Sequence, residues 1–478
     1  MTMLSDQSAV ALAGMIRARQ LSAEELMREV LAQIERLNPR VNALVSLLPA
    51  EEALALARQS DQILAQTGPM GPLHGLPFAV KDLEETKGLR STFGSLLFKD
   101  HIPAEDGLMV ARLRAAGALI IGKTNVPEFG FGSQSYNPIF GTTLNAYDQS
   151  RTSGGSSGGA AVALALRLLP LADGSDHGGS LRNPAAFNNI YGFRPSPGRI
   201  PDLQGDAFSL GLPVLGPMAR SLDDLAMLFA VQAGPERRIP TGPTEAGASF
   251  AKLQPASLKG KKIGWLGDLS GYLPMESGIL ELCRAGLAVM ADLGAEIEPA
   301  SLGFAPEAIW QSWCRLRSWG VAARLGVFYQ DPAKRALLKP EAQWEIEQGL
   351  ALSGMEIARQ IDQRNLWLAQ ALRLFSRYDA LVLPSAQLFP FAATQYWPNE
   401  VADRKMDSYH RWMEVVTPAT LGGLPSISLP VGFNAAGLPM GMQLMGPPMA
   451  DLDILQMAKS YDDATAWPLR HPPALLQQ

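Results

Sequence analysis

Two stretches rich in glycine and serine, residues 151–161 (RTSGGSSGGAA) and 173–186 (DGSDHGGSLRNPAA), hold the residue types that acyl transfer needs. A serine hydroxyl becomes a nucleophile once a base removes its proton. The glycines ahead of Ser180 can direct several backbone N–H groups into one concavity, which stabilises a developing oxyanion. A flexible linker is the other interpretation, but the apolar run at 159–169 predicts that these glycines lie between core elements.

Lys81 is the candidate base for such a serine, because it ends the apolar run at 77–80. Burial disfavours a charged ammonium and can lower a lysine pKa by about 3–5 units from about 10.4. The local sequence equally allows a surface lysine whose stem lies on apolar residues while its ammonium reaches water. No histidine has the sequence setting of a catalytic base.

Residues 117–124 have the glycine, lysine and threonine spacing of a phosphate-binding P-loop. A P-loop needs free backbone N–H groups, whereas 118–121 (ALII) is an obvious strand. Pro127 also falls where the helix after a P-loop needs its N–H donors. The sequence therefore disfavours a nucleotide site here.

Residues 154–158 match the G-x-S-x-G pattern of α/β-hydrolases, in which the serine follows an apolar strand. The preceding residues 145–152 are polar. The histidine of that family's triad would have to be His410 or His471, and neither has a local signature. This interpretation is disfavoured as well.

The composition narrows the class of protein. The chain has 478 residues, of which 47% are hydrophobic and 18% charged, so it can bury a large core. A net charge of −5 gives no broad basic surface, and we expect no nucleic-acid partner. Cys283 and Cys314 form neither a disulfide framework nor a zinc pattern, so we expect no metal and a reducing compartment. Without a signal peptide or membrane-spanning run, we expect a soluble, cytoplasmic protein with no membrane partner.

The elements that must position these residues alternate between helices and strands. Helices are predicted at 21–37, 108–116 and 451–464, and buried strands at 76–80, 118–121, 380–383, 427–431 and 440–445. This alternation favours an α/β fold in which helices cover a parallel or mixed sheet. We predict one domain over 1–478, with N-terminal helices at 1–70, a catalytic core at 71–235, a helical section at 274–378 and strands returning to the core at 380–465.

These motifs, in their order and spacing, resemble the amidase signature family. The resemblance is carried by PFAVKD (77–82), GKTNVPEF (122–129), SGGSSGGAA (153–161) and DGSDHGGSLRNPAA (173–186), and it extends to GPMARSLDDLA (216–226) and GGLPSISLPVGFNAAGLPMGMQLMG (422–446). The helical section matches only weakly. The family implies a single α/β domain with a mixed, twisted central β-sheet covered by α-helices, and no metal or organic cofactor.

The resemblance also implies a Ser-cisSer-Lys triad. Ser180 would be the nucleophile, Ser156 the bridging serine held by a cis peptide, and Lys81 the base. The backbone N–H groups of His177, Gly178, Gly179 and Ser180 would form the oxyanion hole, with Ser157, Asp176 and Arg182 as supporting groups. Position 177 is commonly a small or β-branched residue in this family. The His177 side chain either lines the pocket passively or contacts substrate or a proton.

We therefore expect an amidase that hydrolyses C–N acyl bonds of small amides through a Ser180 acyl-enzyme, as a monomer or homodimer whose partner is its small-molecule substrate. The alternatives are the A subunit of a tRNA-dependent amidotransferase, which needs a further protein partner, and a noncatalytic binding protein on the same scaffold.

The tryptophans give the only indication of substrate. Seven of the nine lie in the weakly matching stretch: Trp310, Trp313, Trp319, Trp344, Trp367, Trp397 and Trp412. Tyr396, Trp397 and Tyr409 fall in a polar, loop-like segment and are predicted to line a roomy pocket for aryl or hydrophobic amides, anilides, esters or carbamates. Trp310, Trp313 and Arg317 share a helical spacing that ordinary core packing also explains.

Overall fold

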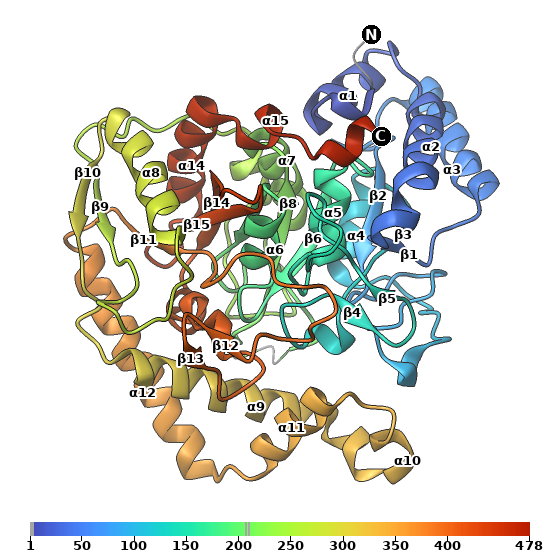
Figure 1. Ribbon diagram of the computed structural model, residues 1–478. Helices are drawn as coiled ribbons and strands as arrows, with labels where there is room; N and C mark the ends of the chain where they lie inside the picture. Colours follow the sequence, from blue (N-terminus) through green and yellow to red (C-terminus); the bar gives the residue numbers. More distant parts are fainter. Residues whose placement is uncertain (1–3, 206–207, 209–210) are drawn as a thin grey trace.

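An eight-stranded sheet forms the centre of the molecule (Figure 1). The computed structural model describes residues 4–205, 208 and 211–478. In the order β10-β9-β11-β15-β14-β7-β8-β6, the strands are β10 (Glu296–Pro299), β9 (Lys262–Trp265), β11 (Ala380–Pro384), β15 (Pro439–Met445), β14 (Ser426–Phe433), β7 (Tyr191–Arg194), β8 (Val214–Ala219) and β6 (Ala172–Asp176). β9 is parallel to β10 and β11, and the other pairs are antiparallel. The predicted mixed sheet is confirmed.

A smaller sheet carries Lys81. It contains β1 (Leu44–Val45), β3 (Leu119–Thr124) and β2 (Pro77–Lys81), in that order. β2 and β3 are parallel, which places Lys81 opposite Thr124. Every residue of β2 is buried, as the continuous apolar run indicates. Lys81 therefore enters the interior at the end of a buried strand.

Three helices form the N-terminal section: α1 (Ala9–Arg17), α2 (Ala23–Val41) and α3 (Ala50–Thr67), blue in Figure 1. A capping box starts α2: the Ser22 hydroxyl accepts from the Glu25 N–H at 3.0 Å, and the Glu25 carboxylate accepts from the Ser22 N–H at 2.8 Å. The helix runs four residues beyond the predicted end, because Leu37 and Val41 continue its buried i, i+4 spacing.

Other helices pack on the sheets or join their strands. They are α4 (Leu108–Ala115), α5 (Gly158–Ala165), α6 (Arg182–Phe187), α7 (Leu222–Gln232), α8 (Ile279–Asp292), α13 (Thr417–Gly422), α14 (Asp451–Thr465) and α15 (Trp467–Arg470). Every residue of α5 and α6 is buried. The glycine- and serine-rich stretches are therefore packed core elements, and the linker interpretation is wrong.

The helical section contains α9 (Pro306–Gln330), α10 (Pro332–Arg335), α11 (Pro340–Leu350) and α12 (Gly354–Phe375). Figure 1 shows these helices below the sheet, away from the N-terminal section. The prediction of a helical section at 274–378 missed the strand β10. Its sequence, Glu-Ile-Glu-Pro, has a low strand propensity, but it forms a strand because it pairs in parallel with β9 at the edge of the sheet. The returning strands β11, β14 and β15 lie inside the same sheet. The division into one domain stays a prediction.

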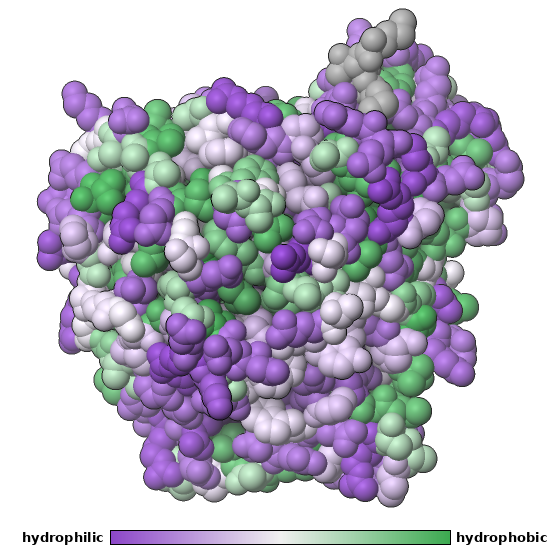
Figure 2. Space-filling model, in the orientation of Figure 1, coloured by the Kyte–Doolittle hydropathy of each residue, from purple (hydrophilic) through white to green (hydrophobic). Residues whose placement is uncertain are grey.

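Short elements complete the fold. They are the hairpins β4 (Tyr136–Asn137) with β5 (Gly141–Thr142) and β12 (Glu400–Val401) with β13 (Arg404–Lys405), and the 3-10 helices Leu4–Asp6, Leu96–Phe98, Glu128–Gly130, Gly247–Phe250, Arg411–Val416 and Ala474–Gln477. Figure 2 shows hydrophilic and hydrophobic residues interspersed over the face of Figure 1. Among the described residues, no helix has the length and apolarity to cross a bilayer.

Candidate active site

Lys81 lies among three serine hydroxyls. Its Nζ donates to Ser156 Oγ at 2.8 Å, to Ser157 Oγ at 2.8 Å and to Ser175 Oγ at 2.9 Å. The residue has no exposed surface, so the snorkelling interpretation is wrong. Burial lowers the pKa of Lys81 to about 7, although the nearby carboxylate of Asp173 raises it. A neutral amine is therefore accessible near pH 7.

Ser156 and Ser157 follow a tight turn before α5, and the peptide bond between Gly155 and Ser156 is cis. The glycines around them leave no room for a larger side chain. A Cβ at Gly155 would lie 3.0 Å from Ser135 Oγ, and one at Gly159 would collide with the backbone of Asn125 and Ala43. Small residues thus let the turn reach the end of β3 and the ammonium of Lys81.

Ser180 lies next to this turn. Its carbonyl accepts a hydrogen bond from the backbone N–H of Ser157 at 3.2 Å. Ser180 is 8% exposed, compared with 2% for Ser156 and none for Lys81, so it is the most accessible of the three. The hydrogen bonds among the described residues include none from the Ser180 hydroxyl, whereas Ser156 is bonded to Lys81. Catalytic hydrogen bonds often tighten only when substrate binds.

The loop from His177 to Ser180 is held by Asp176, which is fully buried. One carboxylate oxygen accepts the Gly179 N–H at 3.0 Å and the other accepts the Leu181 N–H at 3.2 Å. The N–H of Gly179 is therefore occupied, which departs from its predicted place in an oxyanion hole. Among the described residues, the N–H groups of His177, Gly178 and Ser180 have no hydrogen-bond partner. Positive φ explains the glycine at 179, where φ is 85°.

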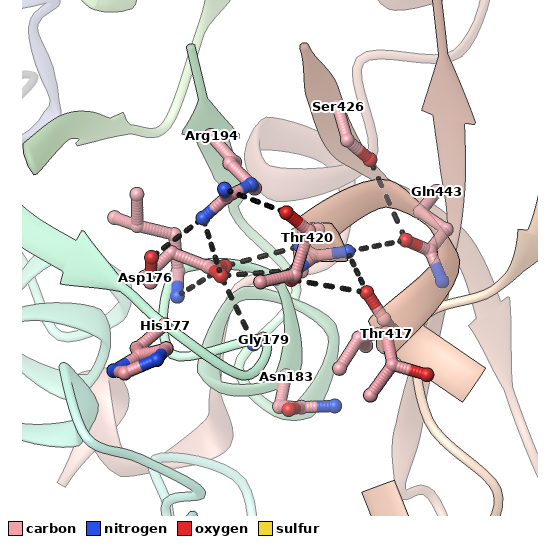
Figure 3. Close-up of polar contacts among 12 residues, drawn as sticks. Asp176, His177, Gly179, Asn183, Arg194, Thr417, Thr420, Ser426 and Gln443 are labelled. Carbon is pink, nitrogen blue, oxygen red and sulfur yellow. Dashed lines mark hydrogen bonds and ion pairs between the residues drawn. The ribbon is translucent and has the colours of Figure 1, made fainter. Parts of the chain in front are cut away.

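Arg182 joins the Asp176 carboxylate to distant strands and helices. Its guanidinium donates to Asp176 at 3.0 and 2.9 Å, to Gln443 Oε1 at 2.6 Å and to Thr420 Oγ1 at 2.9 Å. Figure 3 shows Asp176 between Arg194 and Gly179, with Thr420 and Gln443 on the side of α13 and β15. Burial raises the pKa of Asp176, but the two guanidiniums outweigh it and hold that pKa far below its ordinary value. The carboxylate is thus a charged, fixed anchor for the loop.

Sequence reasoning missed Thr420, Gln443 and Arg194, because they come from elements with no local link to residue 176. Two other residues of the site were missed, although the sequence pattern of their strand could have indicated them. Asp173 and Ser175 alternate along β6 and so share one face. Asp173 accepts the backbone N–H of Lys81 at 3.0 Å, and burial raises the pKa of its carboxyl to about 6.

His177 is partly buried beside Trp313, with ring centroids 6.2 Å apart. Burial lowers the pKa of His177 well below its ordinary value, with a further contribution from the Arg317 guanidinium, so the imidazole is neutral. Its Nε2 is buried and has no partner among the described residues. The Trp313 indole N–H donates to the His177 carbonyl at 2.9 Å.

The seven tryptophans between residues 310 and 412 have different settings: Trp310, Trp313, Trp367 and Trp412 are buried in the core, Trp319 and Trp344 are exposed, and Trp397 lines a pocket. Trp310 and Trp313 are buried and stack at 5.2 Å, as the core-packing interpretation predicts. Tyr396, Trp397 and Tyr409 do line a common pocket, but its volume is about 10 Å³, room for roughly one water molecule. The predicted roomy aromatic pocket is not present there in the described structure. No group of three or more His, Cys, Asp or Glu among the described residues is placed to hold a metal ion.

Comparison with known proteins gives whole-chain matches. The glutamyl-tRNA(Gln) amidotransferase A subunit of Symbiobacterium thermophilum is 35% identical over 480 residues, 96% of each chain. The protein of the same name from Thermus thermophilus is 34% identical, over 95% of this chain and 97% of its own. Among solved structures, a bacterial aryl acylamidase of the amidase signature family superposes with a TM-score of 0.91 at 28% identity over 98% of both chains. The peptide amidase of Stenotrophomonas maltophilia gives 0.81 at 27% identity over 98% of both chains.

The expectation of a small-molecule partner alone, without nucleic acid, is wrong. The curated relatives that match nearly the whole chain are named as subunits of an enzyme acting on glutamyl-tRNA(Gln). Net charge misled the prediction, because one subunit of an assembly need not carry the surface that contacts nucleic acid. The Amidase family model matches residues 25–455. The chain belongs to the amidase signature family of hydrolases.

Proposed function

We propose that this chain cleaves a C–N acyl bond with Ser180 as nucleophile, Ser156 as bridging serine and Lys81 as base. The single observation that carries the proposal is the 2.8 Å contact between Lys81 Nζ and Ser156 Oγ, made by a fully buried lysine whose pKa is lowered to about 7. The 177–180 loop supports the proposal as well. Its N–H groups at His177, Gly178 and Ser180 have no acceptor among the described residues and so are available to bind an oxyanion.

The proton steps follow from this arrangement. Lys81 accepts the Ser156 proton while Ser156 accepts the proton of Ser180, whose oxygen bonds to the carbonyl carbon. The oxyanion is stabilised by N–H groups of the loop, for which Gly178 and Ser180 are the candidates. The C–N bond then breaks as the leaving nitrogen takes the proton back through Ser156. Water repeats the relay on the acyl-enzyme, releasing the acid and restoring Ser180.

The names of the curated relatives favour one use of this chemistry, the A subunit of a tRNA-dependent amidotransferase. At 31–35% identity over at least 95% of the chain, they support this candidate more strongly than any other. In that role the chain would cleave a primary amide donor, such as glutamine, and release its nitrogen as ammonia for transfer within an assembly. The acyl-enzyme would be hydrolysed as before.

A second candidate is an amidase for aryl or other hydrophobic amides. Apolar side chains flank part of the 177–180 loop: Trp313 and Met413 lie in the Cβ direction of Gly178, and Val416 lies beside Asn183 Oδ1 in that of Gly179. The superposition with an aryl acylamidase at a TM-score of 0.91 supports this candidate. An apolar wall favours an apolar acyl or leaving group by about 1–3 kcal/mol per well-placed group.

A direct comparison of donors separates the two. The purified chain is given glutamine, a small aliphatic amide and an anilide, and ammonia or aniline release is measured for the wild type and Ser180→Ala. An amidase predicts anilide turnover by the chain alone. A component of an amidotransferase predicts a preference for glutamine and activation by the other subunits of a relative's assembly. Binding of these amides without Ser180-dependent release would support the noncatalytic alternative and overturn the proposal.

A further inference from the structure

The peptide group between His177 and Gly178 is held by a side chain from the helical section. The Trp313 indole N–H, on α9, donates to the His177 carbonyl at 2.9 Å. In a trans peptide the carbonyl and the next N–H point in opposite directions. The only cis peptide among the described residues is Gly155–Ser156. Fixing the His177 carbonyl on Trp313 therefore fixes the Gly178 N–H to point away from the indole.

That N–H is available. Among the described residues, the Gly178 N–H has no hydrogen-bond partner, whereas the next N–H along, that of Gly179, is bonded to Asp176. The loop is thus anchored at adjacent peptide groups by two different residues. Asp176 orients the Gly179 and Leu181 N–H groups, and Trp313 orients the Gly178 N–H.

Trp313 is rigidly placed for this task. It has no exposed surface and stacks on Trp310 with an interplanar angle of 26°. The Arg317 guanidinium lies 5.5 Å from the ring centroid on the indole. A Cβ at Gly178 would lie 2.8 Å from the Trp313 ring, so indole and loop are in direct contact. The indole cannot swing away without disturbing this packing.

We propose that Trp313 is a positioning residue for the oxyanion hole, which aims the Gly178 N–H at the substrate's carbonyl oxygen and polarises it through the hydrogen bond to the same peptide group. The inference rests on the proposed function, because it assumes attack by Ser180. It assigns a role in catalysis to α9, in the helical section.

The test removes the indole N–H of residue 313 and keeps an aromatic ring there. Trp313→Phe is compared with the matched control Trp310→Phe, since Trp310 is also buried and in the same stack but its indole N–H has no hydrogen bond among those of the described residues. We expect Trp313→Phe to lower kcat about 5- to 10-fold with KM within about twofold, the effect of one misdirected donor. Trp310→Phe should keep kcat within about twofold.

Two further measurements separate positioning from packing. An arylboronic acid, which forms a tetrahedral adduct on an active serine, should bind Trp313→Phe more weakly by the same factor as kcat falls. If Trp313→Phe does not fold, Trp313→3-benzothienylalanine removes only the N–H and is measured instead. Equal kcat for wild type and a folded Trp313 variant, or equal losses in both tryptophan variants, would overturn the inference. A wild type without Ser180-dependent turnover would instead overturn the proposed function on which it rests.

Discussion

Lys81 determines the pH dependence of the proposed chemistry. Its pKa is lowered to about 7 by burial, and only the neutral amine accepts a proton. The neutral fraction rises as pH rises through 7, so kcat/KM for an amide should increase from pH 5 to about 8 and then level off. A plateau that began well below pH 6 would contradict the assignment of Lys81 as base.

Removal of Lys81 should affect amides more than esters. An amine leaving group must be protonated, whereas an alkoxide leaves more readily without it. We expect Lys81→Ala to lower kcat/KM for an amide by about 10²–10⁴-fold and for the matching ester by clearly less. Equal losses on the two substrates would show that Lys81 does not relay the proton.

Asp173 tunes that lysine. Its carboxylate accepts the Lys81 backbone N–H at 3.0 Å and raises the pKa of Lys81, opposing burial. Asp173→Asn removes the negative charge, so the pKa of Lys81 should fall and the acidic limb of the kcat/KM profile should move to lower pH. Asp453→Asn, at an exposed position on α14, is the control and should leave the profile in place. An unmoved or upward-shifted limb in a folded Asp173→Asn enzyme would contradict this role.

At the scale of elements, the close approach of α5 to β3 positions Ser156. A Cβ at Gly159 would collide with the backbone of Asn125 and Ala43, whereas one at Gly14, inside α1, meets no atom within 4 Å. Gly159→Ala should therefore destabilise the fold by about 1–3 kcal/mol through overpacking, and Gly14→Ala should stabilise it by up to about 1 kcal/mol. Urea unfolding followed by circular dichroism measures both. Similar effects of the two substitutions would contradict the packing described for α5.

The sequence predicted those elements whose signals are local. The apolar run ending at Lys81 indicated β2, and the Ser22–Glu25 spacing indicated the start of α2. It did not predict the contacts of Arg182 with Thr420 and Gln443, because these residues meet only after the returning strands enter the sheet. Nor did it indicate that Gly179 donates to Asp176, since that depends on the loop's dihedral angles.

At the scale of the whole molecule, one fold serves relatives with different names. Subunits of glutamyl-tRNA(Gln) amidotransferases match almost the full chain by sequence, and an aryl acylamidase superposes over 98% of it. The shared catalytic core is therefore compatible with different substrates and assemblies. The helical section contributes Trp313 beside the 177–180 loop, and we expect substrate differences to arise there.

The nucleophile itself provides the most direct test of the proposed function. The wild-type chain is treated with a fluorophosphonate, digested and analysed by peptide mass spectrometry, with Ser180→Ala and Ser156→Ala in parallel. A covalent adduct on Ser180, absent from the Ser180→Ala chain and formed much more slowly in Ser156→Ala, is the predicted result. An adduct on Ser156, or none on either serine while amide turnover persists, would contradict the assignment of Ser180 as nucleophile.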